Sequence, residues 1–269
     1  MDAKKVPQKK QMKIVKKPYV TGSPVDQHTA KEAAKTFLAM LVMMLAFLLL
    51  SSMLLWDNLF LRILTNGVVL LGAWGLFYAN GMSKGATAVN SGEILYQRQQ
   101  EGKPINAADL RASYHPAKGF ITALLGSIPC FLCALVLALI GKQQMYGLSS
   151  LPTWLQSYTS RSEVGDALAY YAVTQAMTVE DVLRIIVRMM IMPVVSMVGT
   201  ENAANLLLVE RLAPLLVLMP SVCYGVGYTQ GVRARTQVHS SIAAADRKYK
   251  RKEKKKQQQR RVRQPEQLN

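Results

Sequence analysis

The chain has 269 residues, with 33 Lys and Arg against 16 Asp and Glu, and a formal net charge of +17. Half of the residues are hydrophobic, but apolar and charged residues are segregated along the chain. Long uncharged stretches exclude an ordinary soluble helical domain, because a soluble helix needs a polar face. The only cysteines, Cys130, Cys133 and Cys223, lie in apolar stretches, which excludes a disulfide framework.

The N-terminal part of the chain changes abruptly from basic to apolar. Residues 1–36 carry nine Lys and three acidic residues, and we expect a basic, disordered cytoplasmic tail there. Residues 37–56 contain no charge, and about 20 apolar residues at 1.5 Å each cross about 30 Å of hydrocarbon. This run exceeds the apolar region of a cleaved signal peptide. A second apolar run over 59–78 follows, so we predict a transmembrane hairpin over 37–80.

A polar segment and a third apolar run come next. Residues 81–118 hold five basic and three acidic residues, and we predict a cytoplasmic loop with a short helix over 93–100 and another after Asn106. Its first residues, 81–87, are interpreted as a flexible exit from the second span. Residues 119–141 contain no charge and are predicted to form the third transmembrane helix.

The following segment differs in charge from the loops before it. Residues 142–182 contain two basic residues, four acidic residues, and several Tyr and Trp, which favour a membrane–water interface. We therefore expect an extracytoplasmic loop over 142–178. Thr178 is predicted to cap a new helix, with Asp181 as its N3 partner.

The region 179–211 is the hardest to place. Glu180, Arg184 and Arg188 recur every four residues along an otherwise apolar helix, and Pro193 breaks it. Such a helix can lie in the interface, enter the membrane and return, or span within a bundle that shields both Arg side chains. A fifth full crossing would place the two basic tails on opposite sides of the membrane. We therefore predict that this region is interfacial or re-entrant.

The last apolar run and the C-terminal tail complete the pattern. Residues 212–228 are predicted to form the fourth transmembrane helix, and Gly227 and Gly231 form a G-x-x-x-G that favours close helix packing. Residues 229–269 form a strongly basic tail with thirteen basic and three acidic residues.

Charge then predicts the topology. Lys and Arg gather in cytoplasmic segments, and the N-terminal tail, the 81–118 loop and the C-terminal tail are the basic ones. Both termini in the cytoplasm require an even number of crossings. The expected fold is all-α: a multi-pass protein of the cell membrane with about four transmembrane helices and one interfacial or re-entrant amphipathic helix.

No catalytic constellation emerges from the residues. His28, His115 and His239 are each isolated in polar segments and are interpreted as solvated loop histidines, so we predict no metal site, cofactor or catalytic residue. Five charges fall at or near membrane depth, where burial is costly without a partner. They are Arg62, Arg184, Arg188, Glu210 and Arg211.

These charges allow two interpretations. In the structural one, Arg62 reaches towards the headgroups and Glu180 pairs with Arg184 within its own helix. In the functional one, Arg184, Arg188 and Glu210 line a polar site that binds an anionic substrate or headgroup.

The basic block of the C-terminal tail is the strongest functional signal. Its cations can attract anionic lipid headgroups or bind nucleic-acid phosphates without sequence specificity. The leading hypothesis is a non-enzymatic scaffold or accessory subunit whose tails bind anionic lipid, RNA or the ribosome, or an acidic protein. The alternative is a small transporter or channel component built around Arg184 and Arg188. The block comprises Arg247, Lys248, Lys250, Arg251, Lys252, Lys254, Lys255 and Lys256.

Overall fold

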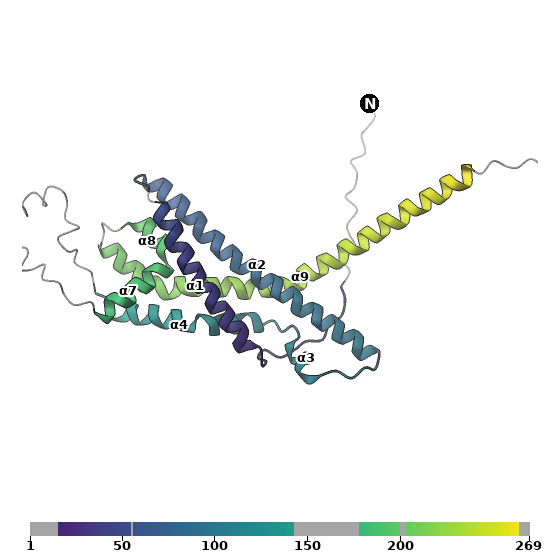
Figure 1. The fold of residues 1–269 in the computed structure, drawn as a ribbon, viewed down its shortest axis with the longest axis horizontal. Coiled ribbons are helices and arrows are strands. Elements are labelled where there is room, and N and C mark those ends of the chain that lie inside the picture. The colour runs from purple at the N-terminus through teal and green to yellow at the C-terminus, as the bar shows by residue number, and fades with distance from the viewer. Residues whose placement is uncertain (1–15, 55, 143–177, 200–202, 264–269) are drawn as a thin grey trace, which may run out of the picture.

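The computed structural model describes residues 16–54, 56–142, 178–199 and 203–263. In these ranges the regular structure is helical and contains no strand (Figure 1). The helices are α1 (Thr29–Met53), α2 (Leu59–Gln100), α3 (Ala107–Ala112), α4 (Lys118–Ile140), α7 (Val179–Met190), α8 (Met192–Val198) and α9 (Ala203–Arg263).

Four of these helices, α1, α2, α4 and α9, are long and apolar enough to cross a membrane. Large apolar side chains such as Leu45, Leu64, Leu139 and Leu215 point outward and are more than half or about half exposed. Soluble monomers rarely expose so much contiguous apolar surface. The expected all-helical fold with four candidate spans is therefore confirmed.

The four long helices run alternately between two ends of the bundle. At one end, here called the hairpin end, the short turn between Met53 and Leu59 joins α1 to α2, and α4 stops. At the other, the tail end, Asp26 just before α1 pairs with Lys118 at the start of α4. α9 leaves the bundle at this same end (Figure 1). The N-terminal segment and the C-terminal helix thus emerge on one side.

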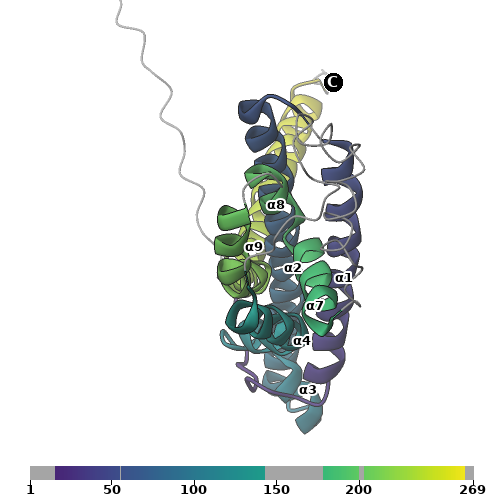
Figure 2. The same ribbon diagram turned by 90° about the vertical axis from the view of Figure 1, so that its left-hand side faces the viewer.

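α7 and α8 form a bent pair at the hairpin end, nearest the viewer in Figure 2. The capping box between Thr178 and Asp181 starts α7 as expected. Ile191 interrupts the helix between α7 and α8, and Pro193 lies in the first turn of α8. α7 starts beside Lys142 at the end of α4, and α8 stops with Gly199 against Arg62 near the start of α2.

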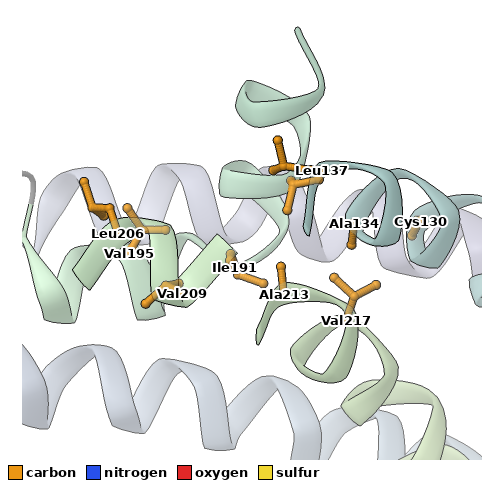
Figure 3. Packing of buried hydrophobic residues seen from close by; sticks show 10 residues of the cluster. Cys130, Ala134, Leu137, Ile191, Val195, Leu206, Val209, Ala213 and Val217 are labelled. Carbon is orange, nitrogen blue, oxygen red and sulfur yellow. The ribbon is translucent and has the colours of Figure 1, made fainter. Parts of the chain in front are cut away.

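Both ends of the α7–α8 pair therefore lie at the hairpin end, while its bend reaches inward. Around the bend, Val187, Ile191 and Val195 are buried against α4 and the first part of α9 (Figure 3). The pair thus enters and leaves the bundle at the same end. The predicted boundary at 211 is wrong, however, because α9 already begins at Ala203.

The helices α2 and α9 are both longer than the apolar runs that predicted them. α2 continues to Gln100, so residues 81–87 are helical and do not form the flexible exit that we expected, and the separate helix over 93–100 is the end of α2. α9 runs for 61 residues and carries the basic tail as a helix. The remaining short helix, α3, begins after Asn106, whose side chain accepts a hydrogen bond from the Ala108 amide, as expected.

Two pairs of glycines explain why α2 extends so far. Gly81 and Gly85 of α2 face Gly227 and Gly231 of α9, and a Cβ atom at any of the four would overlap backbone atoms of the opposing helix. The G-x-x-x-G of α9 therefore meets a second G-x-x-x-G, and the backbones cross in close contact. The close packing expected of Gly227 and Gly231 is confirmed, and it holds α2 helical beyond its apolar part.

The N-terminal tail is also more ordered than we expected. Residues 29–36 belong to α1, and the segment before it is bound to the tail end of the bundle. The amides of Val20 and Gly22 donate to the carbonyls of Gly92 and Tyr114 at 3.2 and 2.9 Å. The expectation of disorder over 1–36 is thus wrong for residues 19–36. Residues 1–15 and most of the expected loop 142–178 lie outside the described residues.

Candidate functional site: a buried arginine cluster and a basic arm

Glu210 of α9 holds the two arginines of α7 at the hairpin end. Nε of Arg184 donates to both carboxylate oxygens at 3.0 and 3.2 Å, and Nε of Arg188 donates to Oε1 at 2.8 Å. The side chains of Arg184 and Glu210 are 6% and 3% exposed. The structure therefore brings together the three residues that we singled out for an intramembrane polar site.

Arg184 also ties three helices together. Its Nη2 atom donates to Oε1 of Glu180 at 2.8 Å and to the carbonyl of Lys142 at 2.7 Å, just after α4. The same Glu180 oxygen accepts the Lys142 amide at 3.1 Å. The expected pairing of Glu180 with Arg184 is confirmed. Asp181 also lies 3.9 Å from Nη1 of Arg184, so this arginine cluster contains two guanidinium groups and three carboxylates.

The other two charges near the spans lie apart from this cluster. Arg62 is half-buried, with its guanidinium against Gly199, and its Nε atom has no hydrogen-bond partner among the described residues. It therefore packs against the end of α8, which sequence reasoning did not foresee. Arg211 is exposed on α9.

The basic block lies on the last part of α9, which we call the basic arm and define as residues 246–263. Beyond the crossing with α2, this part of the helix projects alone (Figure 1). All eight cations of the block are exposed, and none has a salt bridge within the described residues. The arm therefore presents its positive charge to the surroundings.

A second buried cluster of charged side chains, which sequence reasoning missed, links α2 to α9 just before the basic arm. Glu93 of α2 accepts a hydrogen bond from Nε of Arg235 at 3.1 Å, and Nε2 of His239 lies 2.8 and 2.9 Å from its two carboxylate oxygens. Arg235 also bonds the side-chain oxygen of Asn90. His239 is 8% exposed, so its interpretation as a solvated loop histidine is wrong. Arg235 and His239 lie four residues apart and therefore share one face of a helix, and this spacing was the feature of the sequence that could have indicated a shared partner.

A third group of contacts fastens the N-terminal segment to the tail end. Nζ of Lys118 donates to Oδ2 of Asp26 at 2.6 Å and to the carbonyl of Ala112 at 3.0 Å. Burial raises the pKa of Asp26, but the hydrogen bonds from Lys118 and Thr29 lower it by more, and the resulting pKa lies below the ordinary value of 3.8. The carboxylate is therefore ionised at neutral pH and charge-paired.

Aromatic rings extend this attachment. The rings of Tyr114 and Tyr228 stack with their centroids 5.4 Å apart, and Tyr19 meets Tyr114 edge-on at 5.8 Å. Burial raises the pKa of Tyr114, so its hydroxyl is neutral at physiological pH. The N-terminal segment, the 101–117 connection and α9 are thereby joined at one place.

No ligand-like cluster of His, Cys, Asp or Glu that could hold a metal ion occurs in the described residues. Comparison with known proteins finds no matching family, no matching curated protein and no matching solved structure. Function must therefore be inferred from the chain's own residues.

Proposed function

We propose that this chain is a multi-pass protein of the cell membrane that serves as a non-enzymatic scaffold or accessory subunit. Its four spans anchor it, and the basic arm binds a polyanionic partner in the cytoplasm. The observation that carries the proposal is the continuity of α9, which joins the helical bundle to the exposed basic block without a break.

The length of α9 favours a cytoplasmic partner over the membrane's own lipids. At 1.5 Å per residue, Arg247 and Lys256 lie about 28 and 42 Å along the helix from Tyr228, where the apolar span ends. Attraction to anionic headgroups decays over a Debye length of about 8 Å. An arm that follows the direction of α9 therefore carries its block beyond the reach of the surface charge.

The composition of the arm favours RNA over an acidic protein. Eight cations cover about two thirds of the circumference over three helical turns, and Tyr249 and Glu253 occupy the remaining face. Protein interfaces usually rely on buried aromatic or aliphatic anchors, which this surface lacks. Phosphate backbones, in contrast, are bound by dispersed Lys and Arg without base readout. An RNA backbone, such as that of the ribosome, is the partner that this chemistry fits best.

The test uses three forms of the full-length protein purified in mild detergent: wild type, a deletion of 246–263, and a form with all eight block cations changed to Gln. The Gln form is the matched control, because it keeps the length and helix propensity of the arm. We expect RNA to co-purify with wild type only, and to be lost after ribonuclease. The logarithm of the affinity should fall with that of the salt concentration with a slope of about −5 when most cations engage phosphates.

Other outcomes would overturn parts of the proposal. A protein partner that survives ribonuclease but requires the cations would replace RNA with an acidic protein. Retention of the same partner by the deletion would assign recognition to the bundle. Tight binding of wild type to anionic vesicles, lost in the Gln form, would make the lipid surface the target.

The orientation is tested separately. Both tails emerge at one end of the bundle, and the basic segments gather there, which supports a cytoplasmic position for that end. In a version without the native cysteines, a cysteine at Gln99 should react with an impermeant thiol reagent only after the cells are opened. A cysteine at Asp57 should react in intact cells. The reverse pattern would place both termini outside.

The alternative of a transporter gains no support from a specific contact. It requires Arg184 and Arg188 to meet an anionic substrate, but Glu210 and Glu180 already pair with them. If the alternative held, Arg188→Ala would change the flux of a substrate at an unchanged protein level.

A further inference from the structure

A polar cavity of about 280 Å³ lies at the tail end of the bundle, and neither the arm nor the arginine cluster uses it. It is formed by the first turns of α1 and α4, the middle of α2 and the part of α9 that carries Tyr224 and Tyr228. The apolar parts of α1, α4 and α9 all border this level: Phe120 lies two residues after Lys118, and the apolar run of α9 ends at Tyr228. In a membrane, the cavity would lie at the depth of the lipid headgroups.

The cavity contains charges of both signs. Glu32 and Lys84 pair across it at 3.2 Å, and both side chains remain accessible, at 32% and 47% exposure. Asp26 and Lys118 form the second pair, which is almost closed to solvent. Glu32 also binds Nζ of Lys35 at 2.6 Å, so a ligand at this carboxylate competes with two solvent-exposed ammonium groups. The Asp26–Lys118 pair is closed to such exchange.

Two tyrosines contribute hydroxyl groups to the lining. Tyr224 and Tyr228 are each 5% exposed, and neither hydroxyl has a hydrogen bond within the described part of the chain. Neither oxygen is among the buried polar atoms that lack a partner, so both hydroxyls are accessible. A polar ligand in the cavity could form hydrogen bonds with them.

Two helix N-termini add positive potential. The caps of α1 and α4, His28 and Ala117, make no side-chain hydrogen bond to the first turn. The first amides, of Thr29 and Lys118, donate to the carbonyls of Asp26 and His115. The dipoles of the two helices still favour an anionic group such as a phosphate near their N-termini. With Lys84 close by, the cavity offers one region for a phosphate and, at Glu32, another for a cation.

An apolar groove lies further along the same two helices, beyond the packed cluster of Met40, Phe77 and Tyr224. α1 and α2 separate with distance from their shared turn, leaving a groove of about 420 Å³ between them. On α1, Ala39, Met43 and Leu50 follow Glu32 at 7, 11 and 18 residues, so they share its face. The groove and the polar cavity therefore lie on one side of α1.

The matching face of α2 shows the same order. Phe77 and Ala73 precede Lys84 by 7 and 11 residues and line the groove. Gly72 also lines it, and a Cβ atom there would meet nothing within 4 Å. The polar site for two opposite charges and the apolar groove thus lie along the same faces of α1 and α2.

We propose that this is a binding site for one zwitterionic phospholipid of the phosphoethanolamine type. Its phosphate lies near Lys84 and the N-termini of α1 and α4, its ammonium group donates to Glu32 and the tyrosine hydroxyls, and an acyl chain fills the α1–α2 groove. A primary ammonium has three donors for these acceptors, whereas a choline headgroup has none, so the site selects ethanolamine.

The test measures lipid binding to the full-length protein by native mass spectrometry after exchange into lipid-free detergent. Equal amounts of phosphatidylethanolamine, phosphatidylcholine and phosphatidylglycerol with the same acyl chains are then added. We expect preferential binding of one phosphatidylethanolamine. Glu32→Gln should reduce this preference about tenfold, the change expected for the loss of one charge-assisted hydrogen bond. Glu101→Gln, at an exposed ion pair on the 101–106 connection, is the matched control.

A second variant tests the groove without altering the headgroup site. Gly72→Leu fills open space and should displace the acyl chain, reducing phosphatidylethanolamine binding while leaving the thermal unfolding temperature in lipid-free detergent unchanged. Equal binding of all three lipids, or unchanged binding by both variants, would overturn the proposal. So would tight binding of soluble phosphoethanolamine that Gly72→Leu does not affect, because the ligand would then be a soluble compound.

Discussion

Nε of Arg184 donates to both carboxylate oxygens of Glu210, at 3.0 and 3.2 Å, across the contact between α7 and α9. Loss of Glu210 takes from Arg188 the carboxylate that it binds and leaves the buried Arg184 with only the partners at the start of α7. Breaking a buried ion pair in this way is costly. We expect Glu210→Gln, which preserves shape, to lower the free energy of unfolding by about 3–5 kcal/mol.

Thermal or denaturant unfolding in detergent measures this change. The control is Glu101→Gln, which breaks an exposed pair with Lys103 and should cost no more than about 1 kcal/mol. Equal stabilities of the two variants would show that the arginine cluster does not hold α7 in place.

The glycine crossing of α2 and α9 makes a second prediction. Gly81→Ala and Gly227→Ala each place a methyl group against a backbone oxygen of the other helix, which cannot turn aside. The helices must then separate, and we expect a loss of stability of roughly 1–3 kcal/mol.

Gly75→Ala is the matched control for the crossing. Gly75 lies in α2, as Gly81 does, but a Cβ atom added at Gly75 would meet nothing within 4 Å. Alanine there should therefore be neutral or slightly stabilising. Unfolding midpoints measured in one detergent compare the variants. A tolerated Gly227→Ala would contradict the close approach of the two backbones.

The third prediction concerns the rigidity of the basic arm. Spin labels at Arg233 and Lys255, both exposed on α9, should be about 33 Å apart with a narrow distance distribution, because 22 residues of helix separate them. Ala244→Pro should broaden this distribution and shorten its mean, since proline breaks the hydrogen-bond ladder. Double electron–electron resonance measures both, in a background without the native cysteines.

A broad distribution in the unmodified arm would mean that it bends freely. The block could then fold back onto the membrane surface, and its distance along α9 would no longer disfavour anionic lipid as the target. The variant with proline therefore also reports on partner binding: if reach matters, Ala244→Pro should weaken RNA binding while all eight cations remain.

The attachment of the N-terminal segment gives a fourth prediction. Asp26→Asn removes the charge that pairs with Lys118, so the amides of Val20 and Gly22 should exchange with deuterium faster. Asp109→Asn, an exposed residue in the first turn of α3, is the control and should leave the exchange unchanged. Faster exchange in both variants would point to general loosening.

The pH dependence of this attachment follows from the lowered pKa of Asp26. A carboxyl with a depressed folded pKa adds stability that is fully present above its unfolded value of 3.8 and is lost as pH falls through the folded value. Once corrected for intrinsic exchange rates, protection of Gly22 should be constant from pH 5 to 8 and decrease below about pH 4. A decrease near pH 6.5 would instead implicate a histidine.

The apolar and charged segments of the sequence were sufficient to predict four candidate spans and an interrupted segment before the last one. These features depend on local composition: 37–56 and 119–141 carry no charge, and Pro193 cannot continue a helix. The capping box at Thr178 and the pairing of Glu180 with Arg184 are equally local, and both were predicted correctly.

Contacts between distant residues decided the rest. Polar residues 81–100 have no apolar run to mark them as part of α2; the glycine crossing with α9 and the Glu93 cluster keep them helical there. His239 looks solvated in sequence because its partner lies 146 residues away. The cavity at the tail end is lined by four helices, and no window of sequence contains more than one of its walls. Composition determines which segments can enter a membrane, whereas close approach of separate helices determines which polar groups become buried, paired or left open to a ligand.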